Sequence, residues 1–541
     1  MKDISSTGSF VDFTLENFIY VDKTVYIQQL VKLKRVFISR PRRFGKSLTL
    51  DTIATLFETG VEPYFKGTWI YDKWTEPTYP VLRLNFLNFD KNSLEKFNNK
   101  LNSKITEFAE LNHVTTYKEK EEAEDSIDHL LEQLRLEGRQ IVILIDEYDC
   151  QMTANINNET LYKQFQEKIK SFYANIKDKF AIKFLGITGV TRLKDVSIFS
   201  VGSDINDITN ASAYSQMIGF TRDEIKKYYI DYLKLASSYE NNCSVDDVTD
   251  TQLESMLDMM AQNYDGYCFD EDYEKKVFST WSVNKFFQTM IEKKKVQFGE
   301  YWYDNGGLPS ILVNYLKTHE LNIFEYLDKD KFLKVSSDDF KNPTALTTIN
   351  QNVLMCQTGY LTLRSDLNKT STVALGIPNG EIYKALNRLL ANNIFKGNTD
   401  ITDDYGRSLL EVGTVDDIIN LFNSALNSVS YDNYPIVSES SVQNMLKLYL
   451  LGAHQEVLSE VHEAKGRADL VVNTDNRRIV FEFKYAKNEA EAKSKLSEAV
   501  EQIKTRDYGN ILPKKNELIR IAAVFNADPK VRAFTENQIV P

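Results

Sequence analysis

Cysteine is scarce in this sequence, and the few that occur stand far apart. The four residues are Cys150, Cys243, Cys268 and Cys356, with no C-x-x-C pair among them. This spacing excludes a zinc knuckle and fits a reducing compartment. The five histidines are scattered singly and show no His–Cys or His–Asp arrangement with ligand spacing.

Long apolar stretches and an excess of positive charge are also missing. No apolar run is long enough to span a bilayer, and the start, MKDISSTGSFVDF, lacks the basic and apolar segments of a secretory signal. There are 65 basic and 77 acidic residues, a net charge of −12. This balance argues against a generally basic, nucleic-acid-coating surface but leaves local basic grooves open. We expect a cytoplasmic protein without a membrane partner.

The length and the pattern of the first part predict an α/β protein with several domains. A chain of 541 residues is too long for one ordinary core, so two to four domains are expected. Up to about residue 215, short β-branched runs alternate with longer helical patterns, which predicts a doubly wound parallel sheet. The strand-like runs are RVFISR (35–40), YPVLRLNF (79–86), IVILIDEYD (141–149) and IKFLGITGV (182–190).

The rest of the chain divides by pattern into three further parts. Residues 216–350 are helical and rich in aromatic residues, which predicts a helical middle domain. Residues 351–430 are interpreted as a connector, and the stretch 350–379 is compatible with a hairpin. Residues 431–541 return to an α/β pattern and are expected to form a separate C-terminal domain.

The stretch SRPRRFGKS, residues 39–47, is a phosphate-binding loop in which Arg40 replaces the usual first glycine. A strand precedes the loop and a helix follows it, and the backbone N–H groups of a helix N-terminus favour a phosphate. Gly45 allows close backbone approach, Lys46 can reach the β- and γ-phosphates, and the Ser47 hydroxyl can bind Mg²⁺. The alternative is a basic turn before a helix. The residues expected to hold the nucleotide are Pro41, Arg42, Arg43, Phe44, Gly45, Lys46 and Ser47.

A pair of carboxylates favours the nucleotide site over the basic turn. Asp146 and Glu147 follow a buried strand, at the sheet edge where α/β proteins bind ligands. Asp146 would hold Mg²⁺, and Glu147 would polarise the attacking water. Thr188 and Arg192 come at or just after the next strand and are candidates to sense the γ-phosphate, although such residues are as often structural.

These stretches resemble the N-terminal module of a bacterial AAA-ATPase-like family over most of residues 10–330. The matching pieces are VDKTVYIQQL, SRPRRFGKSLTLDTI, LIDEYD, GVTRLKDVSIFS, IGFTRDEI, YDGYCF, WSVNKFF and YW…GGLPSIL. In that family the R-P-R-R-F-G-K-[ST] spelling is the normal loop. One departure is STWSV, where the family usually has Asn-Pro before the Trp. The resemblance implies a site for ATP.

A second set of charged residues lies near the C-terminus, in HEAKGRADLVVNTDNRRIVFEFKYA. Two strands joined by a turn at 473–477 are expected, and period-two alternation puts Glu482 and Lys484 on one face of the second. Asp469 lies in the first strand, so the three charged groups can converge. Two carboxylates can hold Mg²⁺ and a nearby Lys can orient or activate water, which suits phosphodiester hydrolysis. The alternative is an exposed hairpin with a salt bridge.

The order helix, hairpin, E-x-K strand, helix, strand resembles the PD-(D/E)XK nuclease superfamily. The matching pieces are TGYLTL, LGIPNGEI, GRADLVV, FEFK and EQIKTRDY, with Ala468-Asp469 in place of the usual Pro-Asp. The resemblance implies Asp469, Glu482 and Lys484 as the catalytic core. Glu439 and Gln502 would assist, and Tyr508 matches a downstream Tyr of the family.

The sequence thus predicts a P-loop ATPase coupled through a helical region to a metal-dependent nuclease, with ATP and Mg²⁺ as cofactors. The expected partner is nucleic acid, with DNA and RNA both open, and a homo-oligomer is compatible with the sequence. The alternative is an ATP-driven signalling or defence switch whose C-terminal domain only binds nucleic acid. The intact Asp469, Glu482 and Lys484 set argues against it.

Overall fold

The chain folds into two compact units. A computed structural model describes residues 1–177, 179–193, 205–304, 310–316, 319, 323–343, 345–369, 371–395, 405–453, 455–463, 466–508 and 517–541. The first unit contains Met1–Leu321 and Asp330–Ile382, and the second contains Asn322–Lys329 and Tyr383–Pro541. Parts of two family-like stretches, 194–200 and 305–309, lie outside the described residues.

A five-stranded parallel sheet forms the base of the first unit, in the order β2-β3-β4-β1-β5. The strands are β1 (Arg35–Ser39), β2 (Val81–Asn85), β3 (Ile141–Asp146), β4 (Ile182–Gly189) and β5 (Asn206–Asp207). All six residues of β3 are buried, as the continuous apolar run IVILI requires of a central strand. This sheet confirms the predicted α/β class.

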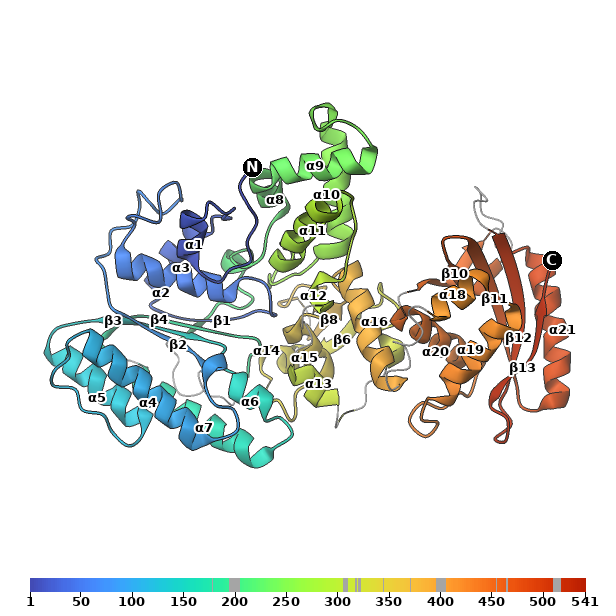
Figure 1. Ribbon diagram of the computed structural model, residues 1–541. Coiled ribbons are helices and arrows are strands. Elements are labelled where there is room, and N and C mark those ends of the chain that lie inside the picture. Colours follow the sequence, from blue (N-terminus) through green and yellow to red (C-terminus); the bar gives the residue numbers. More distant parts are fainter. Residues whose placement is uncertain are drawn as a thin grey trace. The chain divides into compact units, whose positions relative to one another are not determined.

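Helices cover both faces of this sheet. Figure 1 shows α1, α2 and α3 on one side and α4, α5 and α7 on the other. Their bounds are α1 (Phe10–Leu15), α2 (Thr24–Leu33), α3 (Lys46–Thr59), α4 (Leu94–Leu111), α5 (Ala123–Leu136), α6 (Cys150–Ala154) and α7 (Glu159–Ile176). Helix α3 begins directly after β1 and the basic loop, so the loop lies at the carboxyl edge of the sheet.

A helical region follows within the same unit. It contains α8 (Arg222–Tyr228), α9 (Ile230–Asn241), α10 (Asp250–Tyr264) and α11 (Thr280–Lys293). Capping boxes start α8 and α10, where Thr221 pairs with Glu224 and Thr249 with Gln252. The helices share a core of aromatic and methionine side chains, which explains the aromatic-rich composition.

A small antiparallel sheet completes the first unit. Its order is β6-β8-β7, with β6 (Leu333–Ser336), β7 (Thr362–Leu363) and β8 (Thr372–Gly376). The helices near it are α12 (Tyr301–Asp304), α13 (Ser310–Leu316), α14 (Ser337–Lys341) and α15 (Gln351–Thr358). The antiparallel pair β7 and β8 is the hairpin expected within 350–379, and α15 occupies the start of that stretch.

The second unit contains a mixed sheet in the order β13-β12-β11-β10-β9. The strands are β9 (Glu456–Glu463), β10 (Gly466–Asn473), β11 (Arg477–Ala486), β12 (Glu517–Asn526) and β13 (Ala533–Ile539). Strands β11 and β12 are parallel, and the other neighbouring pairs are antiparallel. The predicted turn at 473–477 therefore joins β10 to β11.

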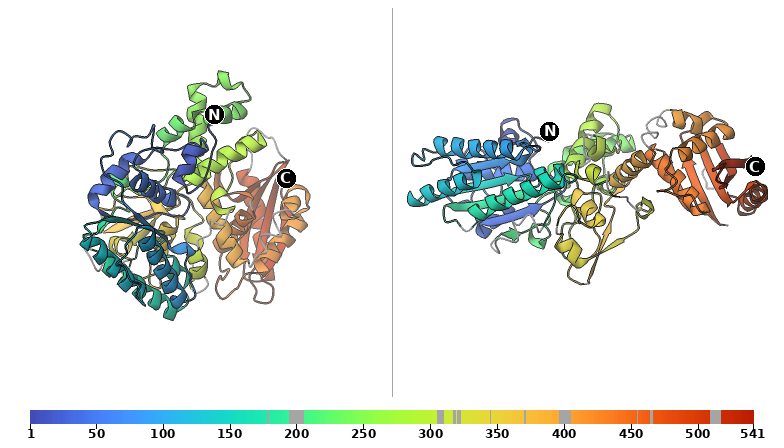
Figure 2. Two further views of the ribbon diagram at one scale, coloured as in Figure 1. Left: turned by 60° about the vertical axis from the view of Figure 1, so that its left-hand side comes forward. Right: turned by 90° about the horizontal axis from the view of Figure 1, so that it is seen from below.

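Alternation along β11 decides what each face of this sheet contacts. Phe481 packs against Phe422 of α19 (Val415–Asn427), whereas Val480 shares a core with Ile503 of α21 (Glu489–Arg506). This unit also contains α18 (Tyr405–Val412), α20 (Glu439–Gly452) and most of α16 (Gly380–Ile394). Figure 2 shows this sheet and its helices from two further directions. Glu482 and Lys484 lie two and four residues after Val480 and therefore belong to the face that α21 covers.

The division into units differs from the predicted domain borders. The predicted middle domain, 216–350, belongs mainly to the same unit as the parallel sheet, so no unit border falls at residue 215. The predicted connector, 351–430, is divided within α16 (Gly380–Ile394), because the second unit resumes at Tyr383. Helical composition distinguishes these regions in sequence, but packing against the sheets decides the grouping.

Candidate functional site

The basic loop adopts a backbone that requires left-handed residues. Gly45 caps α3 with φ 102°, and Arg43, which is not a glycine, has φ 69°. A left-handed non-glycine residue costs on the order of 1 kcal/mol and persists where surrounding contacts fix it. The loop is therefore held in place by its neighbours.

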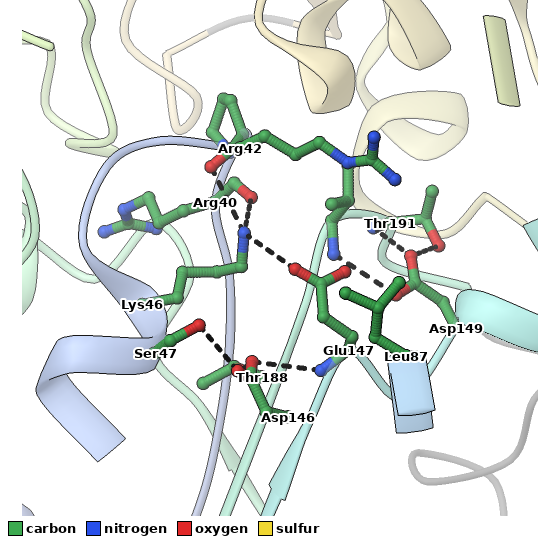
Figure 3. A network of polar contacts seen from close by, with 12 residues as sticks. Arg40, Arg42, Lys46, Ser47, Leu87, Asp146, Glu147, Asp149, Thr188 and Thr191 are labelled. Carbon is green, nitrogen blue, oxygen red and sulfur yellow. Dashed lines mark hydrogen bonds and ion pairs between the residues drawn. The ribbon is translucent and has the colours of Figure 1, made fainter. Parts of the chain in front are cut away.

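Lys46 is the buried cation of this loop. Its side chain is 5% exposed, and its Nζ donates to the carbonyl oxygens of Arg40 (3.1 Å) and Pro41 (3.3 Å). The same Nζ lies 3.7 Å from Oε1 of Glu147. The ammonium group thus stands between the loop and the acidic end of β3, as Figure 3 shows.

Asp146 collects three hydrogen bonds at the end of β3. Its Oδ2 accepts from Ser47 Oγ (2.6 Å), and its Oδ1 accepts from Thr188 Oγ1 (2.5 Å) and from the N–H of Glu147 (3.0 Å). The structure therefore brings together Asp146 and Ser47, the two residues expected to hold the metal, and Thr188, one of the two sensor candidates (Figure 3).

Glu147 is held beside this cluster in an unfavourable environment for its charge. Its backbone is left-handed, with φ 53°. Burial raises the pKa of its carboxyl, and the neighbouring Asp149 and Asp146 add to this, whereas Lys46 and Arg42 act in the opposite direction. A carboxylate with a raised pKa next to a phosphate-binding loop suits a general base.

Asp149 is a buried residue of this site that sequence reasoning did not single out. It accepts hydrogen bonds from Thr191 N (2.7 Å), Thr191 Oγ1 (2.6 Å) and Val190 N (3.3 Å). Tyr148 adds a bond from its hydroxyl to the Thr191 carbonyl (3.0 Å). A Cβ on Gly189 would lie 2.4 Å from Tyr148, so this close approach needs glycine. The signal was present in LIDEYD, whose last residue lies next to the residues after β4.

Arg40 anchors the loop through buried contacts and does not face the expected phosphate site. Its guanidinium is buried, donates to the carbonyls of Ser39 (2.9 Å) and Thr209 (2.5 Å), and stacks over Phe269 at 4.1 Å. Burial lowers its pKa to about 9. Replacing the usual glycine by Arg40 therefore gives the loop an anchor.

Arg43 and Arg192 are likewise engaged elsewhere. Arg43 donates to the carbonyls of Tyr301 (3.0 Å) and Trp302 (2.6 Å) and lies 4.7 Å from the ring of Trp281. Arg192 forms an ion pair with Asp207. Thr188 is thus brought to the phosphate site, while the Arg192 side chain is directed to β5.

An apolar cleft adjoins the loop within the first unit. It has an empty volume of about 890 Å³, including the space open to solvent. The N-terminal segment, the loop with α3, and the start of the helical region each contribute to it. Its lining includes Tyr20, Val21, Phe44, Leu48, Ile218 and Phe220. No short motif signals this cleft, because its walls come from four distant segments, within 5–27, 43–52, 217–229 and 280–284.

A buried carboxyl connects Arg43 to the helical region. Glu381 accepts from Ser282 Oγ (2.7 Å) and from the N–H of Trp302 (2.7 Å), the residue whose carbonyl binds Arg43. Burial raises its pKa from 4.5 to about 8. Because the folded pKa is raised, the stabilisation from protonated Glu381 is complete below pH 4.5 and is lost as the pH rises through 8.

Glu381→Gln should therefore flatten the pH dependence of stability. Glutamine can accept from the Trp302 N–H through its Oε1 and donate to Ser282 Oγ through its Nε2 without a charge. The variant should therefore gain on wild type by on the order of 4 kcal/mol between pH 5 and pH 9. Thermal unfolding of both proteins at the two pH values measures this. Glu240→Gln, at an exposed position on α9, is the matched control. A constant difference between variant and wild type across this range would contradict the prediction.

The predicted catalytic residues of the second unit form a charged cluster on β10, β11 and α20, in which Glu482 and Lys484 are buried and Asp469 and Glu439 are partly exposed. Lys484 Nζ donates to Glu482 Oε1 (2.8 Å), Glu439 Oε1 (3.3 Å) and the carbonyl of Phe483 (3.1 Å). Asp469 Oδ2 accepts from the N–H of Phe483 (2.8 Å). The structure thus brings four of the predicted residues together: the two core carboxylates, the lysine and Glu439.

Glu482 has a free oxygen inside this cluster. Its Oε2 is buried and has no hydrogen-bond partner among the described residues, although Oε1 binds Lys484. Burial raises its pKa to about 7, with a further contribution from the charge of Asp469. An unsatisfied buried carboxylate oxygen is costly and calls for a cation or a proton.

Gln502 makes its hydrogen bond outside this cluster. Its Nε2 donates to the hydroxyl of Tyr508 (3.3 Å), which also accepts from Arg506 NH1 (2.8 Å). The hydrogen bond to Tyr508 raises the pKa of Arg506, and the charges of Glu482 and Asp469 raise it further. Arg506 was not identified from the sequence.

Two family models match the parts that carry these clusters. Residues 5–199 match a model described as Predicted AAA-ATPase, and residues 437–535 match the PD-(D/E)XK nuclease superfamily. The chain joins an AAA-ATPase-like domain to a PD-(D/E)XK nuclease-superfamily domain. Both resemblances are confirmed over these residues, whereas TGYLTL (358–363) and LGIPNGEI (375–382) lie outside the nuclease match and in the first unit.

A relative matches the chain over nearly its whole length. It is an uncharacterized protein in the vnfD 5′ region of Azotobacter chroococcum mcd 1, 26% identical over 533 residues that cover 95% of this chain and 94% of the relative. Among solved structures, a Walker-type ATPase of Pyrococcus abyssi is 11% identical, with a TM-score of 0.34 over 67% of this chain and 94% of that chain. Cdc6p from Pyrobaculum aerophilum is 11% identical, with a TM-score of 0.23 over 69% and 96%.

The residues present fit a divalent cation in both domains. The parts of the chain that the structure describes contain no group of three or more His, Cys, Asp and Glu side chains with metal-binding geometry. Mg²⁺ usually needs only one or two carboxylates, because substrate phosphates and water complete its shell. Ser47 with Asp146, and Asp469 with Glu482, supply such oxygens, and Glu482 Oε2 is unsatisfied without a cation. No helix within the described residues is long and apolar enough to cross a membrane.

Proposed function

We propose that the AAA-ATPase-like domain binds and hydrolyses ATP. The observation that carries this proposal is the convergence of Ser47 and Thr188 on Asp146, next to Lys46. Lys46 would bind the β- and γ-phosphates, and the Ser47 hydroxyl and Asp146 would hold Mg²⁺, which neutralises phosphate charge when bound. The apolar cleft beside the loop would take the nucleobase.

In this proposal Glu147 orients the attacking water and accepts its proton. Asp149 acts through the backbone, because its bonds to Thr191 and Val190 fix the segment that follows Thr188. Thr188 would sense the γ-phosphate through its shared partner, Asp146. Arg192 keeps its candidate role only if the ion pair with Asp207 opens when nucleotide binds.

Lys46→Ala tests the nucleotide site. Loss of the buried ammonium should weaken Mg·ATP binding by roughly 100-fold, because a charge-assisted phosphate contact is lost in a buried setting. Calorimetric titration with ATP and Mg²⁺ measures the effect. Lys234→Ala, an exposed lysine of α9, should bind as wild type does. Equal affinity of Lys46→Ala and wild type would remove the proposed ATP site.

We infer that the second domain is a metal-dependent nuclease. Asp469 and Glu482 would hold the metal ion, which supplies charge stabilisation at the phosphate when bound. Lys484 would orient the attacking water, and Glu439 would assist by sharing the lysine. Gln502 would act through Tyr508 at the substrate side.

The four cysteines are unpaired, which is consistent with the reducing cytoplasm proposed for this protein.

The experiment that tests this part is cleavage of labelled DNA and RNA, single- and double-stranded, with and without Mg²⁺ and ATP. Metal-dependent cleavage of any of the four substrates supports the nuclease. Binding without cleavage would favour the alternative, an ATP-driven switch whose second domain only binds nucleic acid. Any coupling must be reciprocal for binding, so ATP and nucleic acid would change each other's affinity by one factor.

A further inference from the structure

Four arginines belong to the sequence motifs around the proposed ATP site, and three of them have partners. The contacts of Arg40 and Arg43 described above commit both guanidinium groups to anchoring the loop. Arg192 is paired with Asp207 beyond the end of β4. These three side chains are therefore unavailable to a phosphate unless existing contacts break.

Arg42 differs from these three arginines in having an anchored backbone but no side-chain partner among the described residues. Its backbone is held, because Trp302 Nε1 donates to its carbonyl oxygen at 3.4 Å. Its side chain is half-buried, and within the described residues its guanidinium has neither a hydrogen bond nor an ion pair. Among the described residues, Arg42 thus combines a fixed point of attachment with an unpaired cationic end.

The free end is directed to the catalytic side of the site. Figure 3 shows the Arg42 side chain extending from the loop across the side where Glu147 and Thr191 lie. Lys46 approaches the same carboxylate from the loop, with its Nζ 3.7 Å from Glu147 Oε1. The carboxylate of Glu147 is thus influenced by two cations of the same loop.

We propose that Arg42 is a catalytic arginine supplied in cis, which stabilises the γ-phosphoryl group during ATP hydrolysis. In this step the water oxygen forms a bond to the γ-phosphorus, and the bond from that phosphorus to the β,γ-bridging oxygen breaks. The electron pair remains on ADP, and Glu147 accepts the proton of the water. Arg42 donates N–H groups to the γ-phosphoryl oxygens, whose charge is spread in the loose transition state.

This inference rests on the proposed ATPase function and adds a residue that binds the transition state of hydrolysis more strongly than the ground state. An arginine that acts in the transition state should contribute little to binding of ADP, because ADP lacks the γ-phosphoryl group. It should contribute strongly to binding of ADP with aluminium fluoride, which occupies that position. A residue that only attracts the nucleotide by charge would affect both ligands alike.

The test compares wild type, Arg42→Ala and Arg42→Lys by calorimetric titration with Mg·ADP, with and without aluminium fluoride, and by phosphate release. Arg42→Ala should keep ADP affinity within about threefold, but lose roughly 100-fold in aluminium fluoride complex affinity and in kcat. Arg42→Lys should recover only part of both, because lysine lacks the two-pronged donor geometry. Arg135→Ala, whose arginine pairs only with Glu132 on the surface of α5, is the control.

Each outcome separates this inference from the proposed function. The catalytic role alone is overturned if the wild type hydrolyses ATP and Arg42→Ala loses nothing. It is also overturned if Arg42→Ala loses ADP affinity and aluminium fluoride complex affinity equally. Failure of the wild type to bind ATP would remove the proposed function and this inference together. Selective loss of the aluminium fluoride complex supports the assignment.

Discussion

Glu147→Gln is expected to bind ATP as wild type does and to lose hydrolysis. Glutamine preserves the shape of the side chain beside Lys46, whose Nζ lies 3.7 Å from the carboxylate, but it cannot accept the proton of the attacking water. General-base catalysis contributes about 10²- to 10⁴-fold, so kcat should fall by at least roughly 100-fold. Phosphate release and ATP titration measure the two effects separately.

The pH dependence of the wild-type enzyme gives an independent check on Glu147. Burial raises the pKa of this carboxyl, and the base acts only when it is deprotonated. Activity should therefore fall on acidification at a higher pH than an ordinary glutamate would require. Glu159→Gln, an exposed glutamate at the start of α7, is the matched control and should hydrolyse normally. Wild-type rates in Glu147→Gln would show that another group activates the water.

The convergence at the proposed ATP site could be predicted because it depends on local chain geometry. Lys46 and Ser47 lie at the start of a helix that follows a strand, and Asp146 ends a parallel strand of the same sheet. Parallel strands present their carboxyl ends at one edge, so the side chains meet whatever the rest of the chain does. The same reasoning placed Glu482 and Lys484 on one face of β11.

The parts that could not be predicted depend on residues far away in the chain. Arg40 and Arg43 look alike in the loop, but their partners, Thr209 and Trp302, lie more than 160 residues further on. Nothing in the sequence of the loop indicates that these two serve as anchors while the Arg42 side chain has no partner among the described residues. The apolar cleft also forms only when four distant segments of the chain fold together.

Asp469→Ala and Lys484→Ala are expected to separate metal binding from cleavage in the nuclease-like domain. Asp469 lies beside Glu482, so its loss should remove both Mg²⁺ binding and cleavage. Lysine is not a metal ligand, so Lys484→Ala should stop cleavage while the metal site persists. The structure adds a condition to this expectation. Lys484 lowers the pKa of Glu482 against the effect of burial, so without the lysine the carboxyl holds its proton to a higher pH.

The titrations with Mn²⁺ or Mg²⁺ should therefore be made at several pH values. In the wild type, Glu482 has a pKa of about 7, so metal affinity should rise as the pH passes through 7 and then level off. In Lys484→Ala the same rise should occur at a higher pH, whereas Asp469→Ala should show no such recovery. Lys493→Ala, an exposed lysine paired with Glu489 on α21, is the control and should match wild type.

The salt-bridge alternative makes the opposite forecast for the same measurements. If Lys484 and Glu482 only form a structural pair, Lys484→Ala should lower the unfolding temperature, and neither it nor Asp469→Ala should change metal affinity at any pH. Removing one partner of a buried ion pair costs about 3–5 kcal/mol, so unfolding must be measured together with metal binding. A folded Lys484→Ala domain that binds Mn²⁺ at high pH and cleaves no substrate requires a catalytic lysine. Absence of metal binding by the wild type, with nucleic acid present, would leave a nuclease fold that serves only for binding.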